Sequence, residues 1–129
     1  MDRNPHIKSF VQQVLGCTCP DKVFEQIEDR QVSSPVSPHN RSITIGRRLL
    51  VYIWEVEGAA QFREKFLAML AAGKKERDRR SLNRFRAVLT VSGNHLGVAA
   101  EATLHFSEFD GRDDRIHFHV IPRDIVDDL

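Results

Sequence analysis

One stretch of the sequence, Arg48–Glu57, constrains the fold more than any other because its apolar residues are not confined to one face. They run together before they alternate, at Leu49, Leu50, Val51, Ile53, Trp54 and Val56. A strand with one solvated face alternates strictly between apolar and polar side chains, whereas a strand that is buried on both faces need not. The sequence therefore predicts a central strand that other elements cover on both sides.

The residues around this strand predict a hairpin followed by a helix. In "SITIGRRLLVYIWEVEG", β-branched and aromatic residues flank Gly46 and Arg47, which is typical of two strands joined by a turn. A helix is expected over Ala59–Ala72, with Gly73 at its end. The apolar face of that helix would consist of Phe62, Phe66, Met69 and Leu70.

The C-terminal part of the chain predicts three further strands. They follow a basic stretch and have the sequences "FRAVLTVSG", "EATLHFSEF" and "RIHFHVIP". In the last two, apolar residues alternate with polar ones, and Asp110 and Gly111 between them suit a turn. We therefore expect the last two strands to form a hairpin.

The first 32 residues predict a helical hairpin. Apolar residues at helical spacing mark its first helix, at Ile7, Phe10, Val11, Val14 and Leu15. Gly16 suits the end of this helix, and Pro20 suits the first position of a second one. The apolar face of the second helix would hold Val23, Phe24 and Ile27. In this interpretation "GCTCP" is the connector of the hairpin, and the proline- and serine-rich residues 33–40 are a connecting loop.

Together these elements predict an α+β fold in a single domain that spans residues 1–129. The domain would comprise the helical hairpin of residues 1–32, the loop of residues 33–40, and a sheet with one crossover helix over residues 41–129. We expect a mostly antiparallel sheet of about five strands with the helices on one face.

The charge and the cysteine content of the chain narrow the classes of partner. Lys and Arg number 19 and Asp and Glu number 18, so the chain as a whole does not attract polyanions over a long range. No apolar run is long enough to cross a membrane, and the start "MDRNPHIK" lacks the apolar core of a secretory signal. A single Cys-x-Cys is typical of free thiols or metal ligands in a reducing compartment. We therefore expect a cytoplasmic protein with no membrane partner.

Both cysteines stand in "GCTCP", and they predict a thiol centre. If Pro20 begins a helix, Cys19 occupies the N-cap, where unpaired backbone N–H groups and the helix dipole stabilise an anion. We expect this position to lower the pKa of the Cys19 thiol, which favours redox reactivity and the binding of zinc or iron. Cys17 could ligate the same metal ion or form a disulfide with Cys19. The alternative is that both cysteines pack in the turn as small apolar side chains.

Three histidines are candidates to complete a metal site, because two thiolates do not fill a tetrahedral coordination sphere. Strand alternation places His117 and His119 on one face of "RIHFHVIP", and the expected hairpin places His105 on the same face. The three imidazoles could ligate one metal ion or share protons. A second subunit could also supply ligands, so the sequence allows a homo-oligomer. The alternative is a solvated polar face that is rich in histidine.

The segment "RIHFHVIPR", Arg115–Arg123, resembles the signature of the histidine triad nucleotide hydrolases and transferases. In that signature, alternating histidines and apolar residues are often followed by proline and arginine. The resemblance implies that His117 is the nucleophile that takes up a nucleotidyl group and that His119 is the third histidine. The first histidine of the family falls on Arg115. Asn94, which ends "TVSGN", parallels an asparagine that often precedes the motif.

The stretch "KKERDRRSLNRFR", residues 74–86, predicts a local basic patch. It holds seven basic and two acidic residues, so its charge of 7 − 2 = +5 contrasts with the near-neutral chain. Arginines interleaved with Leu82 and Phe85 could contact the phosphates of a nucleic acid. We favour the alternative, in which the stretch extends a solvated helix into a loop and pairs its charges at helical spacing.

The leading hypothesis from the sequence is a small accessory protein that binds a transition metal or responds to redox changes. Its site would use Cys17, Cys19 and one or more of His105, His117 and His119. The alternatives are a nucleotide hydrolase or transferase and a nucleic-acid-binding module. The motifs of P-loop, Rossmann, α/β-hydrolase and zincin enzymes do not occur, and the sequence leaves open whether the protein is an enzyme.

Overall fold

The computed structural model describes residues 4–15, 26–32, 38–56, 61–93, 95–111 and 113–126. Their elements follow in the order α1 (Asn4–Ser9), the π-helical turn η1 (Phe10–Val14), β1 (Ile27–Gln31), β2 (Arg41–Ile45), β3 (Leu49–Val56), α2 (Phe62–Arg79), β4 (Arg84–Val91), α3 (His95–Glu108), β5 (Ile116–Pro122) and the 3₁₀ helix η3 (Arg123–Val126). The predicted α+β class is confirmed. None of the helices in these ranges is long and apolar enough to span a membrane.

The five strands form one sheet in the order β1-β2-β3-β4-β5. The pairs β1–β2 and β2–β3 are antiparallel, whereas β3–β4 and β4–β5 are parallel. The predicted mostly antiparallel sheet is therefore wrong, because the sheet is mixed. Its parallel half arises because α2 and α3 are crossover helices. Each returns the chain to the end of the sheet at which the preceding strand began, so the next strand runs in the same direction. The structure thus has two crossover helices in place of the one expected.

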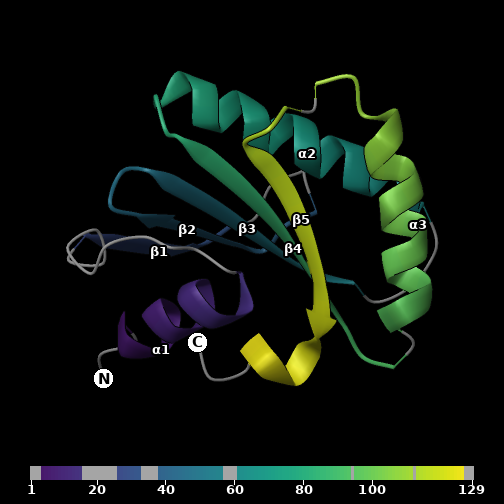
Figure 1. The fold of residues 1–129 in the computed structure, drawn as a ribbon, viewed down its shortest axis with the longest axis horizontal. Coiled ribbons are helices and arrows are strands. Elements are labelled where there is room, and N and C mark those ends of the chain that lie inside the picture. Colours follow the sequence, from purple (N-terminus) through teal and green to yellow (C-terminus); the bar gives the residue numbers. More distant parts are fainter. Residues whose placement is uncertain are drawn as a thin grey trace.

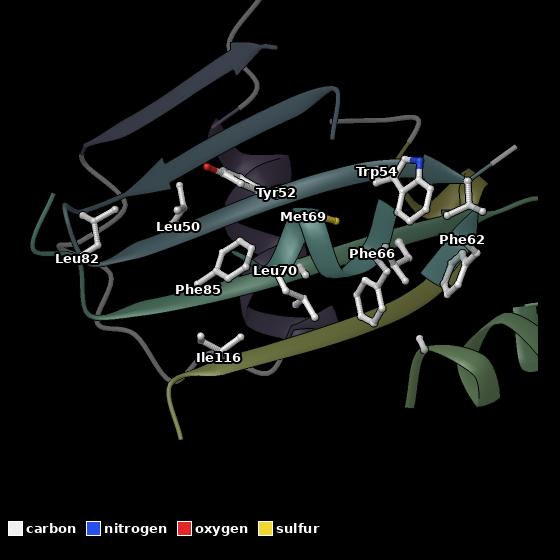
Figure 2. Packing of buried hydrophobic residues seen from close by; sticks show 14 residues of the cluster. Leu50, Tyr52, Trp54, Phe62, Phe66, Met69, Leu70, Leu82, Phe85 and Ile116 are labelled. Carbon is white, nitrogen blue, oxygen red and sulfur yellow. The ribbon is translucent and has the colours of Figure 1, made fainter. Parts of the chain in front are cut away.

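The strand β3 lies in the middle of the sheet and is buried on both faces, as predicted. One face, with Leu50, Tyr52 and Trp54, packs under α2, as Figure 2 shows. The other face, with Leu49, Val51 and Ile53, packs with buried residues of α1 and η1. Helices therefore cover both faces of the sheet, with α2 and α3 on one side and α1 on the other (Figure 1). The expectation of helices on one face is wrong because a strand that is apolar on both sides needs two apolar layers.

The expected strand "EATLHFSEF" is wrong, since its residues up to Glu108 belong to α3. The period-two pattern of Ala102, Leu104 and Phe106 also contains a helical spacing of four residues, from Val98 through Ala102 to Phe106. The structure follows the helical spacing, because Ala102 is fully buried whereas Leu104 is 59% exposed. As a consequence, Asp110 and Gly111 lie in the connection from α3 to the parallel strand β5 and not in a hairpin.

The first predicted helix is confirmed in α1 and η1, whose buried residues Ile7, Phe10, Val11 and Leu15 come from the expected apolar face. The predicted connector and most of the second helix, residues 16–25, lie outside the described residues. Where the description resumes, Ile27–Gln31 is the edge strand β1, so the helical hairpin of residues 1–32 is wrong in this part. Tertiary pairing overrides helix propensity here, because Arg41 on β2 binds Asp29 on β1 with bonds of 2.6 and 2.9 Å. Of the predicted loop, residues 33–37 also lie outside the description.

The helix α2 continues past the predicted end at Gly73 as far as Arg79. A glycine in a helix usually weakens it, but this one has a packing role. A side chain at this position would overlap the ring of Phe85 on β4, so only glycine lets α2 approach the sheet this closely. The glycine that suggested a helix end in the sequence therefore marks a close contact between helix and strand.

Candidate functional site

The predicted thiol centre at Cys17 and Cys19 lies outside the residues that the structure describes. Among the residues it does describe, no group of three or more histidine, cysteine, aspartate or glutamate side chains is arranged to hold a metal ion. Binding of zinc or iron at the cysteines is therefore a prediction that depends on the sequence alone.

The structure separates His105 from His117 and His119, so the predicted three-histidine face is wrong. His105 belongs to α3, where its ring centroid lies 6.0 Å from that of Phe62 on α2. On β5, Phe118 packs into the same helical layer. Because side chains alternate along a strand, His117 and His119 project from the opposite face of the sheet. The helical conformation of α3 thus leaves only His117 and His119 as a pair.

Several cations of the basic stretch are held in ion pairs. Arg77, which is buried, donates hydrogen bonds of 2.7 and 3.0 Å to the two carboxylate oxygens of Asp113 and bonds of 2.9 and 3.1 Å to Asp78. The bonds from Arg77 lower the pKa of Asp113 to about 2. Lys74 donates a bond of 2.9 Å to the carbonyl of Gly111. These contacts attach α2 to the connection between α3 and β5.

Arg80 has an equally structural role at the end of α2. It donates bonds of 2.7 Å to Glu76 on the same helix and 3.3 Å to Glu28 on β1. It also donates a bond of 3.1 Å to the hydroxyl of Thr44 on β2. These bonds hold the end of α2 over the antiparallel half of the sheet, which agrees with the structural alternative for this part of the stretch.

Four other basic side chains, Arg84, Arg86, His117 and His119, lie on β4 and β5 and are called here the basic strand cluster. Arg86 and His117 are direct neighbours across the two parallel strands. Arg84 lies two residues before Arg86, and His119 lies two residues after His117, so alternation directs all four to the face opposite α2 and α3. In the described part of the chain, none of the four forms an ion pair with a carboxylate.

Within the described ranges, no negative charge compensates the cluster. Burial, the charge of Arg86 and the proximity of His117 lower the pKa of His119 to about 4, so its imidazole is neutral at pH 7. Burial and the neighbouring charge of Arg84 also lower the pKa of Arg86. In addition, Nε2 of His119 is buried and has no hydrogen-bond partner among the residues that the structure describes. An anion beside the cluster would raise the lowered pKa values of His119 and Arg86 and could form a hydrogen bond with Nε2 of His119.

His117 is the exposed histidine of the pair. Its Nε2 lies 3.0 Å from the backbone carbonyl oxygen of Asp114. A carbonyl oxygen only accepts hydrogen bonds, so this contact requires the proton on Nε2. In the neutral imidazole the other ring nitrogen, Nδ1, then carries the lone pair, and it is the nitrogen of His117 that is suited to act as an acceptor or a nucleophile.

The spacing of the basic strand cluster matches a phosphate group. Adjacent strands are about 4.8 Å apart, and alternate residues along a strand are roughly 7 Å apart, so neighbouring members of the cluster can reach one small anion. The planar guanidinium of arginine forms paired hydrogen bonds with phosphate or carboxylate oxygens. The arrangement is therefore suited to bind an oxyanion on the surface of the sheet.

A second polar group, which the sequence did not indicate, lies under α2. The Tyr52 hydroxyl donates a hydrogen bond to Glu76, and the His39 ring stacks on the Tyr52 ring at 3.6 Å between centroids. Burial raises the pKa of Tyr52 and lowers that of His39. Burial alone would raise the pKa of Glu76, but the bonds from Tyr52 and Arg80 outweigh it and lower this pKa. The only signal in the sequence was a tyrosine within an apolar strand, and the charges here are compensated, which indicates a structural role.

Comparison with protein-family models, with curated proteins and with solved structures finds no match to this chain. The resemblance to the histidine triad signature is confined to the nine residues Arg115–Arg123. A function for the protein is therefore indicated by the chemistry of its side chains and not by a relative.

Proposed function

We propose that the protein binds a small phosphate-bearing molecule, such as a nucleotide, at the basic strand cluster. One observation carries this proposal: Arg84, Arg86, His117 and His119 lie together on one face of β4 and β5 with no carboxylate partner in the described part of the chain. The unpartnered Nε2 of His119 adds a buried polar atom that lacks a hydrogen bond.

The physical basis is the unfavourable free energy of a charge that is removed from water without compensation. Arg86 is partly buried, and the charge of Arg84 repels it. A bound phosphate would supply the missing negative charge and several hydrogen-bond acceptors. It would also stabilise the imidazolium form of His119 and so raise the pKa of that side chain from about 4.

A small ligand suits the cluster better than a nucleic acid. The uncompensated cations occupy only two strands, and the chain carries a net charge of +1, which gives little long-range attraction to a polyanion. The resemblance of Arg115–Arg123 to the histidine triad signature adds a reason to choose a nucleotide among small phosphates.

The proposal is tested by titrating the full chain with AMP and, separately, with inorganic phosphate, followed by calorimetry and by the NMR signals of the His119 ring. We expect saturable binding and a rise in the pKa of His119. Arg86→Met should weaken AMP binding by about tenfold or more, since it removes a charge-assisted bond. Arg79→Met is the matched control, because Arg79 is an exposed arginine of the same basic stretch on α2.

Two outcomes would overturn the proposal. The first is the absence of binding of both AMP and phosphate at millimolar concentrations. The second is an equal loss of affinity in the Arg79→Met and Arg86→Met variants, which would show a diffuse charge effect and no defined site. Binding of an oligonucleotide with a steep salt dependence, without binding of AMP, would identify the nucleic-acid-binding alternative instead.

The resemblance to the histidine triad family also suggests a catalytic form of the proposal, in which water cleaves the P–N bond of adenosine 5′-phosphoramidate and yields AMP and ammonia. His117 would be the nucleophile, with Nδ1 as the reacting nitrogen because Nε2 contacts the Asp114 carbonyl. A loss of turnover in His117→Ala that is much larger than its loss of AMP affinity would support this role. The absence of turnover in the unmodified protein would limit the function to binding.

The thiol centre at Cys17 and Cys19 is a separate proposal that only the sequence supports, through the predicted N-cap position of Cys19. Metal analysis and an absorption spectrum of protein purified without oxygen or chelator test it. We expect a stoichiometric metal ion, or thiols that react faster than those of a model peptide. A metal-free protein with slowly reacting thiols would remove the proposal.

A further inference from the structure

The two edges of the sheet differ in how they are protected. The edge strand β1 is short and carries the exposed charged residues Glu28, Asp29 and Arg30. Charges of this kind on an edge discourage pairing with another strand. The other edge strand, β5, runs over seven residues, Ile116–Pro122, and contains no lysine, arginine, aspartate or glutamate. In Figure 1 β5 lies in front of the other strands, and no labelled element passes across it.

The pairing with β4 shows which backbone groups of β5 point outwards. The N–H of Phe85 donates a bond of 3.0 Å to the carbonyl of Arg115, so Arg115 and every second residue after it direct their N–H and C=O groups towards β4. The residues between them, Phe118 and Val120, therefore direct both groups away from the sheet. None of the backbone hydrogen bonds among the described residues joins these outward groups to another segment.

At both ends of this free edge, the outward-facing residue has no free N–H donor. The N–H of Ile116 donates to the carbonyl of Asp113 at 3.2 Å, so it is already used. Pro122 has no N–H at all. Only Phe118 and Val120 thus present a complete outward set of one donor and one acceptor each.

We propose that two copies of the chain associate through their β5 strands, antiparallel and centred on His119, so that the two sheets become continuous. In this register Phe118 of each copy lies opposite Val120 of the other, and the two residues exchange N–H···O bonds in both directions. Registers centred on Phe118 or Val120 would instead place outward groups opposite Ile116 or Pro122, which lack a free donor. The register centred on His119 is therefore the two-fold arrangement in which the two residues of β5 that have both a free donor and a free acceptor pair with each other.

The side chains of β5 fit this arrangement. Phe118 and Val120 are partly buried against the helical layer, and pairing would cover more of their apolar surface on the same face of both copies. At the centre, His119 would lie opposite His119 of the other copy. Because the pKa of His119 is about 4, both rings are neutral at pH 7 and do not repel each other.

The test is the mass of the full chain in solution, measured by sedimentation equilibrium over a range of concentrations. We expect a species of twice 14.8 kDa. Val120→Pro should weaken the association by about 30-fold, because it removes one outward donor from each copy. The Val120 N–H makes no bond to β4, so proline is compatible with the edge of the monomer. Val120→Thr, which keeps the N–H, is the matched control and should remain dimeric.

Hydrogen exchange gives a readout that does not depend on a variant. In the unmodified protein the amides of Phe118 and Val120 should exchange slowly when the dimer is populated and quickly after dilution. A protein that is still monomeric at about 200 µM would overturn the proposal. A folded Val120→Pro variant that associates as strongly as the control would overturn it as well.

Discussion

Two groups of arginines from one stretch of sequence meet opposite environments. On α2, Arg77 and Arg80 each bind carboxylates, at distances down to 2.7 Å. On β4, Arg84 and Arg86 meet no carboxylate among the described residues, and burial with repulsion from Arg84 lowers the pKa of Arg86. A run of basic residues is therefore not one functional unit. Its first half forms ion pairs that stabilise the fold, whereas its second half has no carboxylate partner within the described ranges.

The division follows from the turn between the helix and the strand. Ser81 has a φ of 57°, and the N–H of Leu82 donates to the carbonyl of Arg77 at 2.8 Å, which ends α2 and reverses the chain into β4. Along β4 the side chains alternate, so Phe85 enters the helical layer whereas Arg84 and Arg86 project from the opposite face. A change of period from 3.6 to 2 residues thus sends neighbouring cations to opposite sides of the sheet.

The largest expected effect comes from breaking the compensated side. Arg77→Ala should lower the free energy of unfolding by about 2 kcal/mol, because it removes a buried side chain and its hydrogen bonds to Asp113 and Asp78. Arg84→Ala, on the other side of the comparison, should change it by less than about 0.5 kcal/mol. Urea unfolding of both variants measures the difference. Equal losses would contradict the division into a structural and an available half.

The next effect concerns the hydrogen bond between Tyr52 and Glu76. Tyr52→Phe should lower the free energy of unfolding by about 1.5 kcal/mol, because a hydrogen bond to a charged acceptor is lost in a partly buried place. The double variant with Glu76→Gln isolates the coupling between the two side chains. Independent, additive effects of the two substitutions would show that this bond does not stabilise the fold.

For Arg86 on β4 we expect the opposite change in the free energy of unfolding. Arg86→Met should leave the free energy of unfolding unchanged or raise it by about 0.5 kcal/mol, since it removes a partly buried charge that has no carboxylate partner in the described part of the chain. If phosphate binds as proposed, it should raise the melting temperature of the unmodified protein, and the same variant should lose this rise. A loss of more than about 1 kcal/mol in the absence of phosphate would show that Arg86 has a stabilising partner.

The smallest effect is a dependence of stability on pH that belongs to His119. Its pKa falls from 6.5 to about 4 on folding, so between these values the unfolded chain binds more protons than the folded one. The contribution of His119 to stability is therefore present above pH 6.5 and is lost as the pH falls towards 4. Unfolding measured across this window should depend less on pH in His119→Gln. The same slope in both proteins would contradict the assignment.

How far the sequence predicts the fold depends on whether a local pattern has one interpretation. The strands β2, β4 and β5 and the first helix were predicted because the apolar residues of each favour one type of element. The strand β3 was predicted because its apolar residues lie on both faces, which suits a buried central strand. The apolar residues of α3 fit both the strand period of two and the helical spacing of four residues. The burial of Ala102 and the exposure of Leu104 show that the helical spacing is the one that the structure uses. The strand β1 has little apolar pattern, and its conformation depends on pairing with β2, including the bonds between Arg41 and Asp29.

The candidate site was predicted only in part. The alternation of His117 and His119 on one strand was visible in the sequence, as were Arg84 and Arg86 in a basic stretch. Their meeting was not, because Arg86 and His117 are 31 positions apart and become neighbours only through the parallel pairing of β4 with β5. Whether a carboxylate forms an ion pair with the basic strand cluster also depends on where α2 directs its acidic residues.

The sequence by itself determined which residues of β3 enter the core and that both faces of this strand need cover, because side-chain direction along a strand follows from local geometry alone. Only the tertiary structure decided which cations are compensated. Arg77 and Asp113 are separated by 36 positions, and their pairing depends on how α2 packs against the connection that precedes β5. Ion pairs between distant segments follow from packing, and packing is a property of the whole chain.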